Sequence, residues 1–369
     1  MSVSVKLVEW YDPGRRQHDG TGGLPWRNTS DPYRIWVSEV ILQQTRVGQG
    51  LDYYSRFIEA FPDVETLASS DEEKVLKIWQ GLGYYSRARN IHQAAGQIVK
   101  FYKGRIPADY DDLIRLPGIG DYTASAILSI AFGKSYPAID GNAGRVFARI
   151  SGITDPAGST SFIKKVKKIA ERWISRSDPA AFNQAVMDLG ALVCTPENPV
   201  CDVCPVKDDC YAFKNGKTEM LPVIRKKKTK TKRYFHYFVI LWEERNRQMI
   251  MIRKRTGNDI WKNLFEFPMI ESSGPAASEK IMHTLSQKTA AYSVLAGTVP
   301  QKNHYRHILT HREIMADFFI FRIQPEEAPE TIRGLREAFP GAFEIELDGL
   351  NNYAVSRLVD KFLKDNRLL

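Results

Sequence analysis

The feature that most constrains this chain is a short window that holds all four of its cysteines in the pattern C-x6-C-x2-C-x5-C. Prolines between the cysteines indicate a loop rather than a regular helix or strand. Thiolates this close in sequence can surround one tetrahedral zinc ion or one cubane iron–sulfur cluster, whereas a disulfide scaffold spreads its cysteines along the chain. The spacing leaves zinc, an iron–sulfur cluster and unliganded cysteines open. The residues are Cys194, Cys201, Cys204 and Cys210.

The charge balance indicates an anionic partner, with nucleic acid as the first candidate. Lysine and arginine number 52 against 43 aspartate and glutamate residues, so the net charge is +9. The excess is concentrated in seven basic residues within 225–233 and four lysines within 164–168. No apolar stretch approaches the ~20 residues of a membrane helix, and the first residues do not resemble a secretory signal. We therefore expect a cytoplasmic protein without membrane contact and, because no dimerisation signal stands out, a monomer.

Hydrophobic periodicity divides the chain into two domains. From Asp31 to about Leu221, apolar residues recur at helical spacing, and Gly and Pro interrupt the pattern at short intervals. This predicts an all-α domain of many short helices over 1–224. The basic run 225–233 is predicted to be a solvated linker. Runs of β-branched and aromatic residues then alternate with helical stretches, which predicts a separate α+β domain over 234–369.

A glycine-containing hairpin is predicted between two helices, at Leu116-Pro117-Gly118-Ile119-Gly120. Two glycines around one apolar residue allow a tight turn whose backbone N–H groups approach a phosphate at the start of the second helix. Such a hairpin would hold a DNA backbone without reading its base sequence. An ordinary connection between two helices is the alternative.

Two carboxylates are candidate catalytic groups, and each has a simpler alternative. Glu39 is flanked by Val37, Val40 and Ile41 on a predicted helix. A half-buried carboxyl in that position would have a raised pKa and act as an acid, whereas a solvated surface carboxylate is the alternative. Asp140 directly precedes another predicted helix, where an ordinary N-cap is the alternative.

Taken together, the hairpin, the aspartate about 20 residues after it and the cysteine pattern resemble the endonuclease III superfamily of DNA glycosylases. The resemblance extends from about residue 25 to residue 215. It implies a helix–hairpin–helix fold, with a six-helix barrel over about 26–133 and a cluster-bearing part over 1–25 and 134–224. It also implies that the four cysteines hold a [4Fe–4S] cluster.

Within that superfamily the chain is most similar to the MutY family of adenine DNA glycosylases. Three stretches carry the similarity, 24–27 (LPWR), 36–45 (WVSEVILQQT) and 81–90 (GLGYYSRARN). The similarity implies a base-excision-repair enzyme that hydrolyses the N-glycosidic bond of adenine mispaired with 8-oxoguanine, and also with guanine, in double-stranded DNA. It further implies that Glu39 protonates adenine N7 and later activates water, while ionised Asp140 stabilises the oxocarbenium ion.

The same resemblance implies supporting residues around these two carboxylates. The catalytic groups would be positioned by Tyr122, Asn142 and Arg27. DNA contacts would come from Leu42, Gln44, Thr45, Tyr84, Arg87, Leu116, Gly118 and Gly120.

Position 122 bears on the type of glycosylase. Bifunctional members of the superfamily carry a lysine two residues after the second hairpin glycine, and its amine forms the Schiff base that leads to strand cleavage. Here that residue is Tyr122. A phenol forms no imine, so we expect a monofunctional glycosylase.

From about Tyr234 the chain resembles the MutT-like, Nudix-fold domain of the same family, most clearly at 261–268 (WKNLFEFP). The glutamate-rich Nudix hydrolase box does not follow, so we expect a binding module without hydrolase activity. The family recognises 8-oxoguanine through a Phe-Ser-His motif, and the matching residues are Leu309, Thr310 and His311. Threonine keeps the hydroxyl, while leucine replaces the aromatic side chain.

Three alternatives stand beside this interpretation. His304, His307 and His311 would align on a helix and bind a metal, although the surrounding pattern favours a loop followed by a strand. The chain would otherwise be an oxidised-pyrimidine glycosylase with lyase activity, against which the missing lysine and the second domain argue. A non-catalytic, cluster-bearing DNA-binding protein is the third alternative, against which Glu39 and Asp140 argue.

Overall fold

The computed structural model describes residues 1–14, 23–43, 45, 47–225, 229–289, 292–296 and 300–368. Contacts divide the chain into two compact units, the first made of 1–70 and 86–226 and the second of 71–85 and 227–369. Within the described ranges, no helix is both long enough and apolar enough to span a bilayer.

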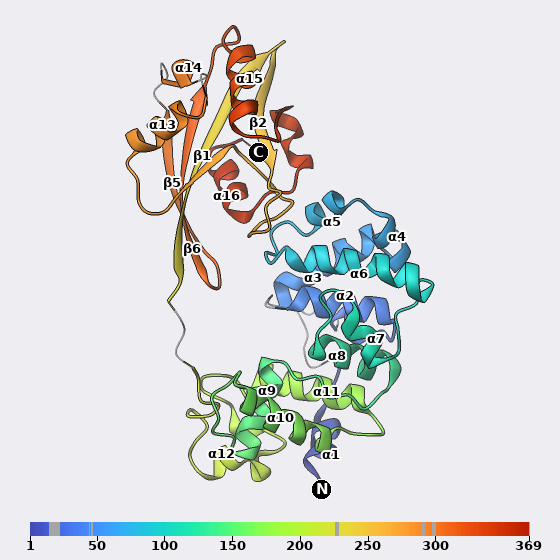
Figure 1. The fold of residues 1–369 in the computed structure, drawn as a ribbon. Coiled ribbons are helices and arrows are strands. Elements are labelled where there is room, and N and C mark those ends of the chain that lie inside the picture. The colour runs from blue at the N-terminus through green and yellow to red at the C-terminus, as the bar shows by residue number, and fades with distance from the viewer. Residues whose placement is uncertain are drawn as a thin grey trace. The chain divides into compact units, whose positions relative to one another are not determined.

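The first unit is built from short helices, which confirms the predicted all-α domain (Figure 1). Several begin at a residue whose side-chain oxygen accepts a first-turn N–H, and Asp31 does so before α2, with Pro32 as the first helical residue. Its α-helices are α1 (Val3–Trp10), α2 (Pro32–Leu42), α3 (Val47–Ala60), α4 (Val64–Ser69), α6 (Ser86–Tyr102), α7 (Tyr110–Arg115), α8 (Asp121–Phe132), α9 (Gly141–Ser151), α10 (Thr160–Trp173), α11 (Pro179–Asp188) and α12 (Tyr211–Lys214). Its shorter turns of helix are Pro25–Arg27, Leu189–Val193, Cys201–Val203 and Lys207–Asp209.

Helix α8 lies at the centre of this unit, with α2 and α11 packed against it. Its buried side chains include the small residues Ala124, Ser125, Ala126 and Ser129, which allow neighbouring helices to approach closely. Most of α2 is buried as well. Glu39 therefore lies on a helix that is surrounded by protein, and not on a solvated helix face.

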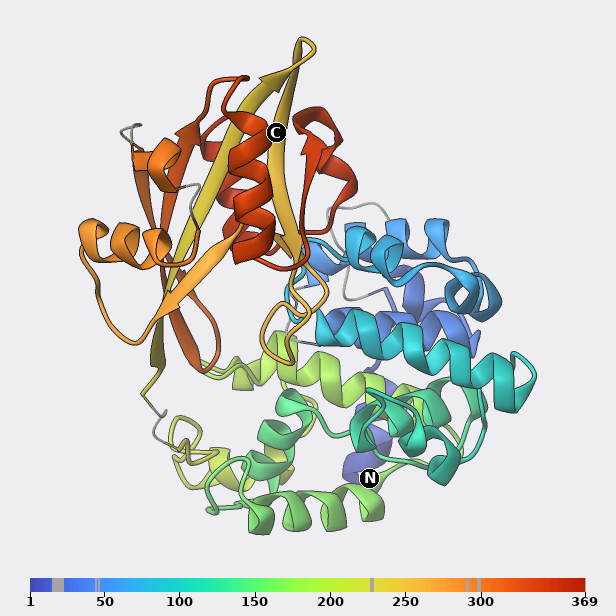
Figure 2. The ribbon, with the colours of Figure 1, turned by 45° about the horizontal axis from the view of Figure 1, so that its top comes forward.

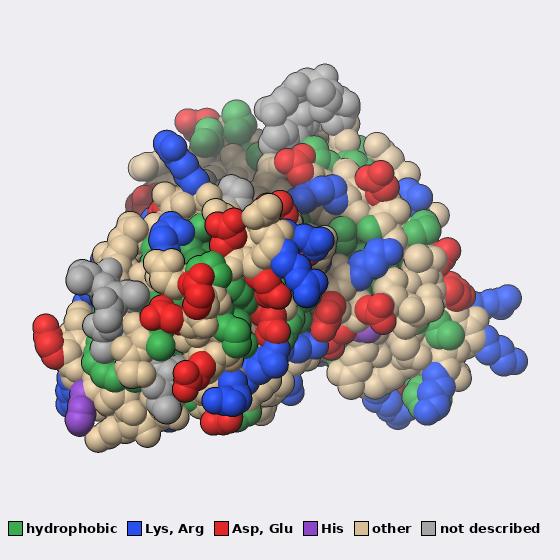
Figure 3. Space-filling model, turned by 90° about the horizontal axis from the view of Figure 1, so that it is seen from above, with side chains coloured by type: hydrophobic (Ala, Val, Ile, Leu, Met, Phe, Trp, Pro, Cys, Tyr) green, Lys and Arg blue, Asp and Glu red, His purple; other side chains and the backbone are tan. Residues whose placement is uncertain are grey.

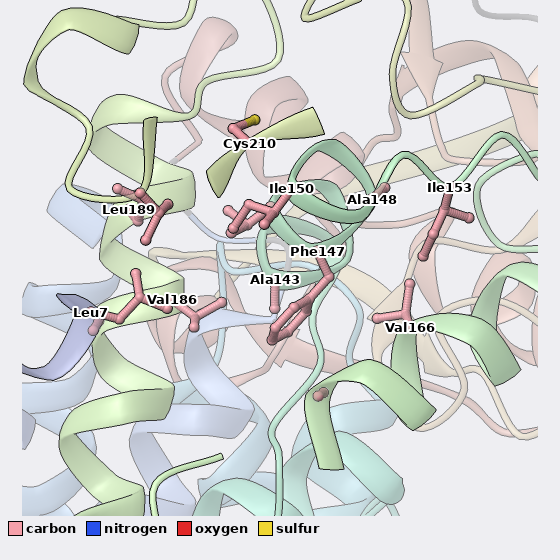
Figure 4. Close-up of a cluster of buried hydrophobic side chains, with 14 of the residues drawn as sticks. Leu7, Ala143, Phe147, Ala148, Ile150, Ile153, Val166, Val186, Leu189 and Cys210 are labelled. Carbon is pink, nitrogen blue, oxygen red and sulfur yellow. The ribbon is translucent and has the colours of Figure 1, made fainter. Parts of the chain in front are cut away.

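A second apolar core joins α1, α9, α10 and α11 to the cysteine window (Figure 4). Leu7 of α1, Phe147 of α9 and Val186 of α11 are buried there together with Cys210. No helix is predicted over 3–10 from the sequence, although Val3, Leu7 and Trp10 recur at helical spacing and pack on this core. The cysteine window is thus attached to the helical core directly.

The second unit contains a seven-stranded sheet in the order β3-β2-β1-β6-β5, with β4 paired to β1 and β7 to β2, which confirms the predicted α+β domain (Figure 2). Strands β1 and β6 are parallel, and β5 and β6 form an antiparallel hairpin. The strands are β1 (Thr231–Glu244), β2 (Arg247–Lys254), β3 (Phe265–Glu266), β4 (Met269–Ser272), β5 (Gln301–Ile308), β6 (Arg312–Arg322) and β7 (Ala342–Glu346). The helices of this unit are α5 (Glu72–Ile78), α13 (Ser278–Ser286), α14 (Tyr292–Ala296), α15 (Ala328–Ala338), α16 (Arg357–Asp365) and the 3-10 helix Leu347–Asn352.

Alternate residues of β1 point into two separate cores on opposite faces of the sheet. Tyr237 is buried on one face with Phe362 of α16. Phe238 is buried on the other face with Leu335 of α15. Because both faces are covered, β1 reads as an unbroken apolar run in the sequence.

Two boundaries differ from the predicted ones. Strand β1 begins at Thr231, inside the predicted linker 225–233, because Thr231 N donates to His311 O (3.1 Å) and the strand pairs with β6 from its first residue. The segment 71–85, predicted within the helical domain 1–224, makes its contacts with the second unit.

The charge of the basic run is also partly neutralised. Arg233 forms ion pairs with Asp259 and Glu271, both at 2.6 Å, so it is a structural residue of the sheet and not a free charge on a tether. Figure 3 shows acidic and basic side chains interspersed on the face it presents, without a continuous basic coat.

Candidate active site

A cavity of about 620 Å³ in the first unit brings the predicted catalytic residues together. Its walls come from α2, α8, α11 and the start of α9, so residues far apart in the sequence meet in it. All five predicted catalytic and positioning residues line it, and so do Leu42, Thr45 and Gly120 from the predicted DNA contacts. The five are Arg27, Glu39, Tyr122, Asp140 and Asn142.

Glu39 is a buried carboxyl at the wall of this cavity. It is 9 % exposed, and the Tyr122 hydroxyl donates a hydrogen bond of 2.6 Å to its Oε2. Burial raises the pKa of the Glu39 carboxyl, while the Tyr122 hydrogen bond and the charge of Arg27 act in the opposite direction. The surface-carboxylate alternative for Glu39 is therefore wrong.

Tyr122 is held as a neutral hydrogen-bond donor. Burial, together with the nearby carboxylates of Glu39 and Asp140, raises the pKa of its phenol well above the ordinary value. Its ring packs against a small apolar cluster that contains Ala138 and Met187. The hydroxyl is thereby directed at Glu39 with little freedom to turn away.

Asp140 serves as the N-cap of α9 and faces the cavity at the same time. Its Oδ1 accepts from Ala143 N at 2.7 Å, and its Oδ2 accepts from Asn142 Nδ2 at 3.0 Å. Burial raises the pKa of the Asp140 carboxyl, and these hydrogen bonds to its charged form oppose that shift. The N-cap interpretation thus holds as well, and the cap fixes the orientation of the carboxylate.

A buried polar network behind the cavity was not predicted from the sequence. Arg27 pairs with Asp188 of α11 (Nη2 to Oδ1, 2.8 Å), and its other nitrogen donates to the Tyr11 hydroxyl at 3.4 Å. Tyr11 in turn donates to Gln184 Oε1, and Gln184 lines the cavity. The sequence signal that could have indicated this network is the presence of polar residues, such as Asn183 and Gln184, on the otherwise apolar helix α11.

The four cysteines line one small cavity together with Arg149. Their thiols are free, and among the described residues no three His, Cys, Asp or Glu side chains are arranged to hold a single metal ion. Arg149 is 2 % exposed and donates to Cys194 Sγ (3.4 Å) and to the carbonyls of Thr195 and Pro196. Hydrogen bonds from this buried guanidinium therefore hold the window in one shape.

A chain of hydrogen bonds connects this window to Asp140. Arg145 donates to Cys194 O (2.8 Å), to Gly190 O (2.6 Å) and to Asn142 Oδ1 (2.9 Å). Gly190 permits the close approach, since a Cβ there would lie 2.8 Å from the Asn142 Cβ. Asn142 is thus positioned by the hydrogen bond from Arg145 and by the close contact with Gly190.

The predicted hairpin lies between α7 and α8. Gly118 has φ +78°, and a Cβ there would meet the Asn90 side chain at 2.7 Å, so glycine is required. Gly120 is the N-cap of α8 and is exposed, which leaves the N–H groups at the helix start accessible. Leu116, in contrast, is buried, so its side chain is unavailable to DNA.

Two further residues were predicted as DNA contacts, Arg87 and Gln44. Arg87 Nη1 donates to the carbonyls of Val40, Ile41 and Gln43 at 2.6–3.0 Å, so it caps the C-terminal end of α2. Gln44 lies outside the described residues.

Leu309, Thr310 and His311 form the turn between β5 and β6. Thr310 and His311 are exposed, whereas Leu309 packs against the core of the sheet. Tyr84 belongs to this unit, and its hydroxyl forms a hydrogen bond with the Thr310 hydroxyl. The structure thus joins two residues that the sequence places 226 positions apart.

The three histidines of the metal alternative do not converge. His304 and His307 lie on the strand β5, where His304 pairs with Asp317 (2.8 Å) and His307 packs edge-on against Trp261. In a strand, side chains three positions apart point to opposite faces of the sheet. The helical spacing of these histidines therefore does not bring them together.

Comparisons with known proteins assign the chain to a class. Residues 37–176 match the family described as HhH-GPD superfamily base excision DNA repair protein, and residues 236–365 match the NUDIX domain. A solved structure of a thermostable thymine-DNA glycosylase aligns with a TM-score of 0.51 and 26 % identity, over 57 % of this chain and 95 % of that one. The fold and the site thus define a helix–hairpin–helix base-excision repair protein with an added Nudix-fold domain.

Similar proteins identify the family within that class. The adenine DNA glycosylase of Buchnera aphidicola (subsp. Acyrthosiphon pisum) is 34 % identical over 308 residues, which is 84 % of each chain. The human adenine DNA glycosylase is 39 % identical over 224 residues, 58 % of this chain and 40 % of that one. The chain belongs to the adenine DNA glycosylase family of base-excision repair enzymes.

Proposed function

We propose that this enzyme removes adenine mispaired with 8-oxoguanine, or with guanine, from double-stranded DNA by hydrolysis alone. The observation that carries the proposal is that two carboxyl groups whose pKa is raised by burial, Glu39 and Asp140, line one cavity of about 620 Å³. Hydrolysis of an N-glycosidic bond requires a proton for the leaving base and a negative charge near the developing sugar cation.

Glu39 is the proton donor in this scheme. The adenosine is flipped out of the duplex, at a cost of a few kcal/mol, and its base enters the cavity. Protonated Glu39 transfers its proton to adenine N7, the glycosidic bond breaks, and adenine leaves. Glu39 is then a carboxylate and accepts a proton from the attacking water.

Asp140 stabilises the sugar cation that forms as adenine leaves. In its ionised form it faces the developing oxocarbenium ion, and the hydrogen bonds from Ala143 N and Asn142 preserve its charge and orientation. Gln184 supplies an amide at the cavity wall for polar contact with the base, and Tyr11 limits how that amide can turn.

The cysteine window holds a [4Fe–4S] cluster in this proposal, and the cluster supports the loop structurally. Support for this assignment is that Cys194, Cys201, Cys204 and Cys210 all line one small cavity, so one group could be bound by all four. Arg149 and Arg145 hold the loop around it. The link from Arg145 to Asn142 connects the loop to the orientation of Asp140.

The second unit reads the base opposite adenine. Thr310 offers a hydroxyl for the Hoogsteen edge of 8-oxoguanine, and His311 is exposed beside it. Leu309 replaces an aromatic residue of the family motif. Its side chain packs against the core of the sheet and so anchors the turn. We assign this unit no hydrolase activity, and we propose that the enzyme acts on DNA as a monomer.

The central test measures base release and covalent trapping in one set of duplexes. The purified protein is expected to release free adenine from an 8-oxoguanine·adenine duplex and no base from an 8-oxoguanine·cytosine duplex. Borohydride is expected to trap no efficient covalent complex, because Tyr122 cannot form an imine. Release of an oxidised pyrimidine, or efficient trapping through residue 122, would contradict the proposal.

Replacing Tyr122 by phenylalanine is expected to move the pH profile of excision. The hydroxyl stabilises the charged form of Glu39, so its removal raises the pKa of Glu39. Because the acid form donates the proton, the decline in single-turnover rate at high pH should shift to higher pH, while the rate at the plateau falls. Tyr102→Phe, which removes a hydroxyl bonded to Asp112 on the outside of the unit, is the control that should leave the profile unchanged.

A further inference from the structure

The segment 71–85 belongs to the second compact unit, although it lies inside the stretch 37–176 that matches the helical repair family. It consists of α5 and the loop that follows, and Tyr84 lies near its end. Tyr84 has φ +46° between Gly83 and a buried Tyr85, so the chain makes a tight turn there and leaves Tyr84 46 % exposed.

Two side chains of this segment satisfy the backbone of one buried residue in the second unit. Val355, 3 % exposed, donates its N–H to Gln80 Oε1 at 3.2 Å. Its carbonyl accepts from the Tyr85 hydroxyl at 3.0 Å. Gln80 Nε2 donates to Asp360 Oδ1 at 3.2 Å, so both ends of the amide are engaged. Loss of either partner would leave a buried backbone group unsatisfied.

Contacts at the rim of the segment are more exposed and contribute less. Lys254 pairs with Glu73 at 2.8 Å, and Lys77 donates to Tyr353 O at 3.3 Å. Solvent screens such pairs, and each contributes little to stability. Asn263 also donates to Glu72 Oε1. Gln80 and Tyr85 differ from these contacts because they bond to the backbone of a buried residue.

The attached segment ends at the turn that we assign to lesion reading. The Tyr84 hydroxyl bonds to the Thr310 hydroxyl, and both side chains reach solvent. Two hydroxyls fixed against each other by their own scaffolds form a preorganised pair, which need not be ordered when a base binds.

We propose that Gln80 and Tyr85 are positioning residues for discrimination of the base opposite adenine. They fasten the loop that carries Tyr84 to the domain that carries Thr310, so that the two hydroxyls meet the same base as one rigid pair. This inference rests on the proposed function, because it takes 8-oxoguanine as the base that the pair reads.

The test compares Gln80→Leu and Tyr85→Phe with the wild-type enzyme. Single-turnover adenine excision is measured opposite 8-oxoguanine and opposite guanine, and the ratio of the two rates is expected to fall about tenfold in each variant. The rate opposite guanine should change little, because neither residue lines the catalytic cavity. Gln93→Leu, an exposed glutamine on α6, is the matched control and should keep the wild-type ratio.

A second readout is independent of activity. Hydrogen exchange at the Val355 amide should become faster in Gln80→Leu, because the acceptor of that N–H is removed. Thr310→Val combined with either variant should lower the ratio by less than the product of the single effects, since both act on one pair. Should Gln80→Leu fail to fold, Tyr85→Phe, which removes one oxygen atom, has the same expected outcome.

An unchanged ratio, or an equal loss on both duplexes, would overturn the positioning role. A wild-type enzyme without preference for 8-oxoguanine would instead overturn the proposed substrate, so the two failures are distinguishable.

Discussion

Replacing Glu39 by glutamine is expected to lower single-turnover adenine excision by about 10²–10⁴-fold, the range typical for loss of a general acid–base group. Glutamine has the same shape and still accepts the Tyr122 hydrogen bond, but it has no proton to transfer to adenine N7. The affinity for a mispaired duplex should stay unchanged, because Glu39 is buried and is not among the residues predicted to contact DNA. Base release and DNA binding are measured on the same duplex.

The control for this variant is Glu59→Gln on α3. Glu59 is exposed, so the substitution makes the same chemical change without altering a buried group. It should leave both excision and affinity at wild-type values. Undiminished excision by Glu39→Gln at unchanged affinity would rule out Glu39 as the acid.

Replacing Cys204 by serine is expected to prevent binding of the proposed [4Fe–4S] cluster and to lower the melting temperature by about 10 °C or more. Metal binding by a loop of this kind is part of the folding free energy, and each kcal/mol lost shifts the melting temperature of a unit this size by about 2–4 °C. The loop is attached through Cys210 to the apolar core of α1, α9, α10 and α11, so its loosening affects the packing of these helices. Iron, sulfide and zinc contents are measured together with thermal unfolding.

Val203→Ser is the matched control, because Val203 is the preceding residue and is 62 % exposed. It should retain the metal content and melting temperature of the wild type. A colourless wild-type protein with one zinc ion per chain would contradict the cluster. Full iron content in Cys204→Ser would contradict the ligand assignment.

Local features of the fold could be predicted because they depend on neighbouring residues. Asp31 and Pro32 start α2, and Asp140 starts α9, through contacts within the first helical turn. The apolar run of β1 and the small-residue helix α8 were likewise recognisable by composition. Helix α1 carries Val3, Leu7 and Trp10 at helical spacing, but the position of this short helix is decided by its packing on α11.

The site was predictable in its residues and not in its connections. The motif around Glu39 identifies the carboxylate, but its burial depends on α8 packing against α2. Asp188 and Gln184 lie on a helix with no recognised motif, and only the folded arrangement brings them to Arg27 and Tyr11. Arg87 was predicted from a motif to contact DNA, but in the folded protein its guanidinium caps the end of α2.

By itself, the sequence determined that this chain has a helical domain with a glycine-containing hairpin, a four-cysteine window and a Nudix-like second domain. These features lie in short stretches, and their spacing or periodicity can be read without knowing the tertiary contacts of the chain. Only the tertiary structure decided that 71–85 packs with the second unit, that Tyr84 meets Thr310, and that Arg145 joins the cysteine window to Asn142. Such contacts join residues tens to hundreds of positions apart, and they exist only after the backbone has brought buried polar groups to partners that satisfy them.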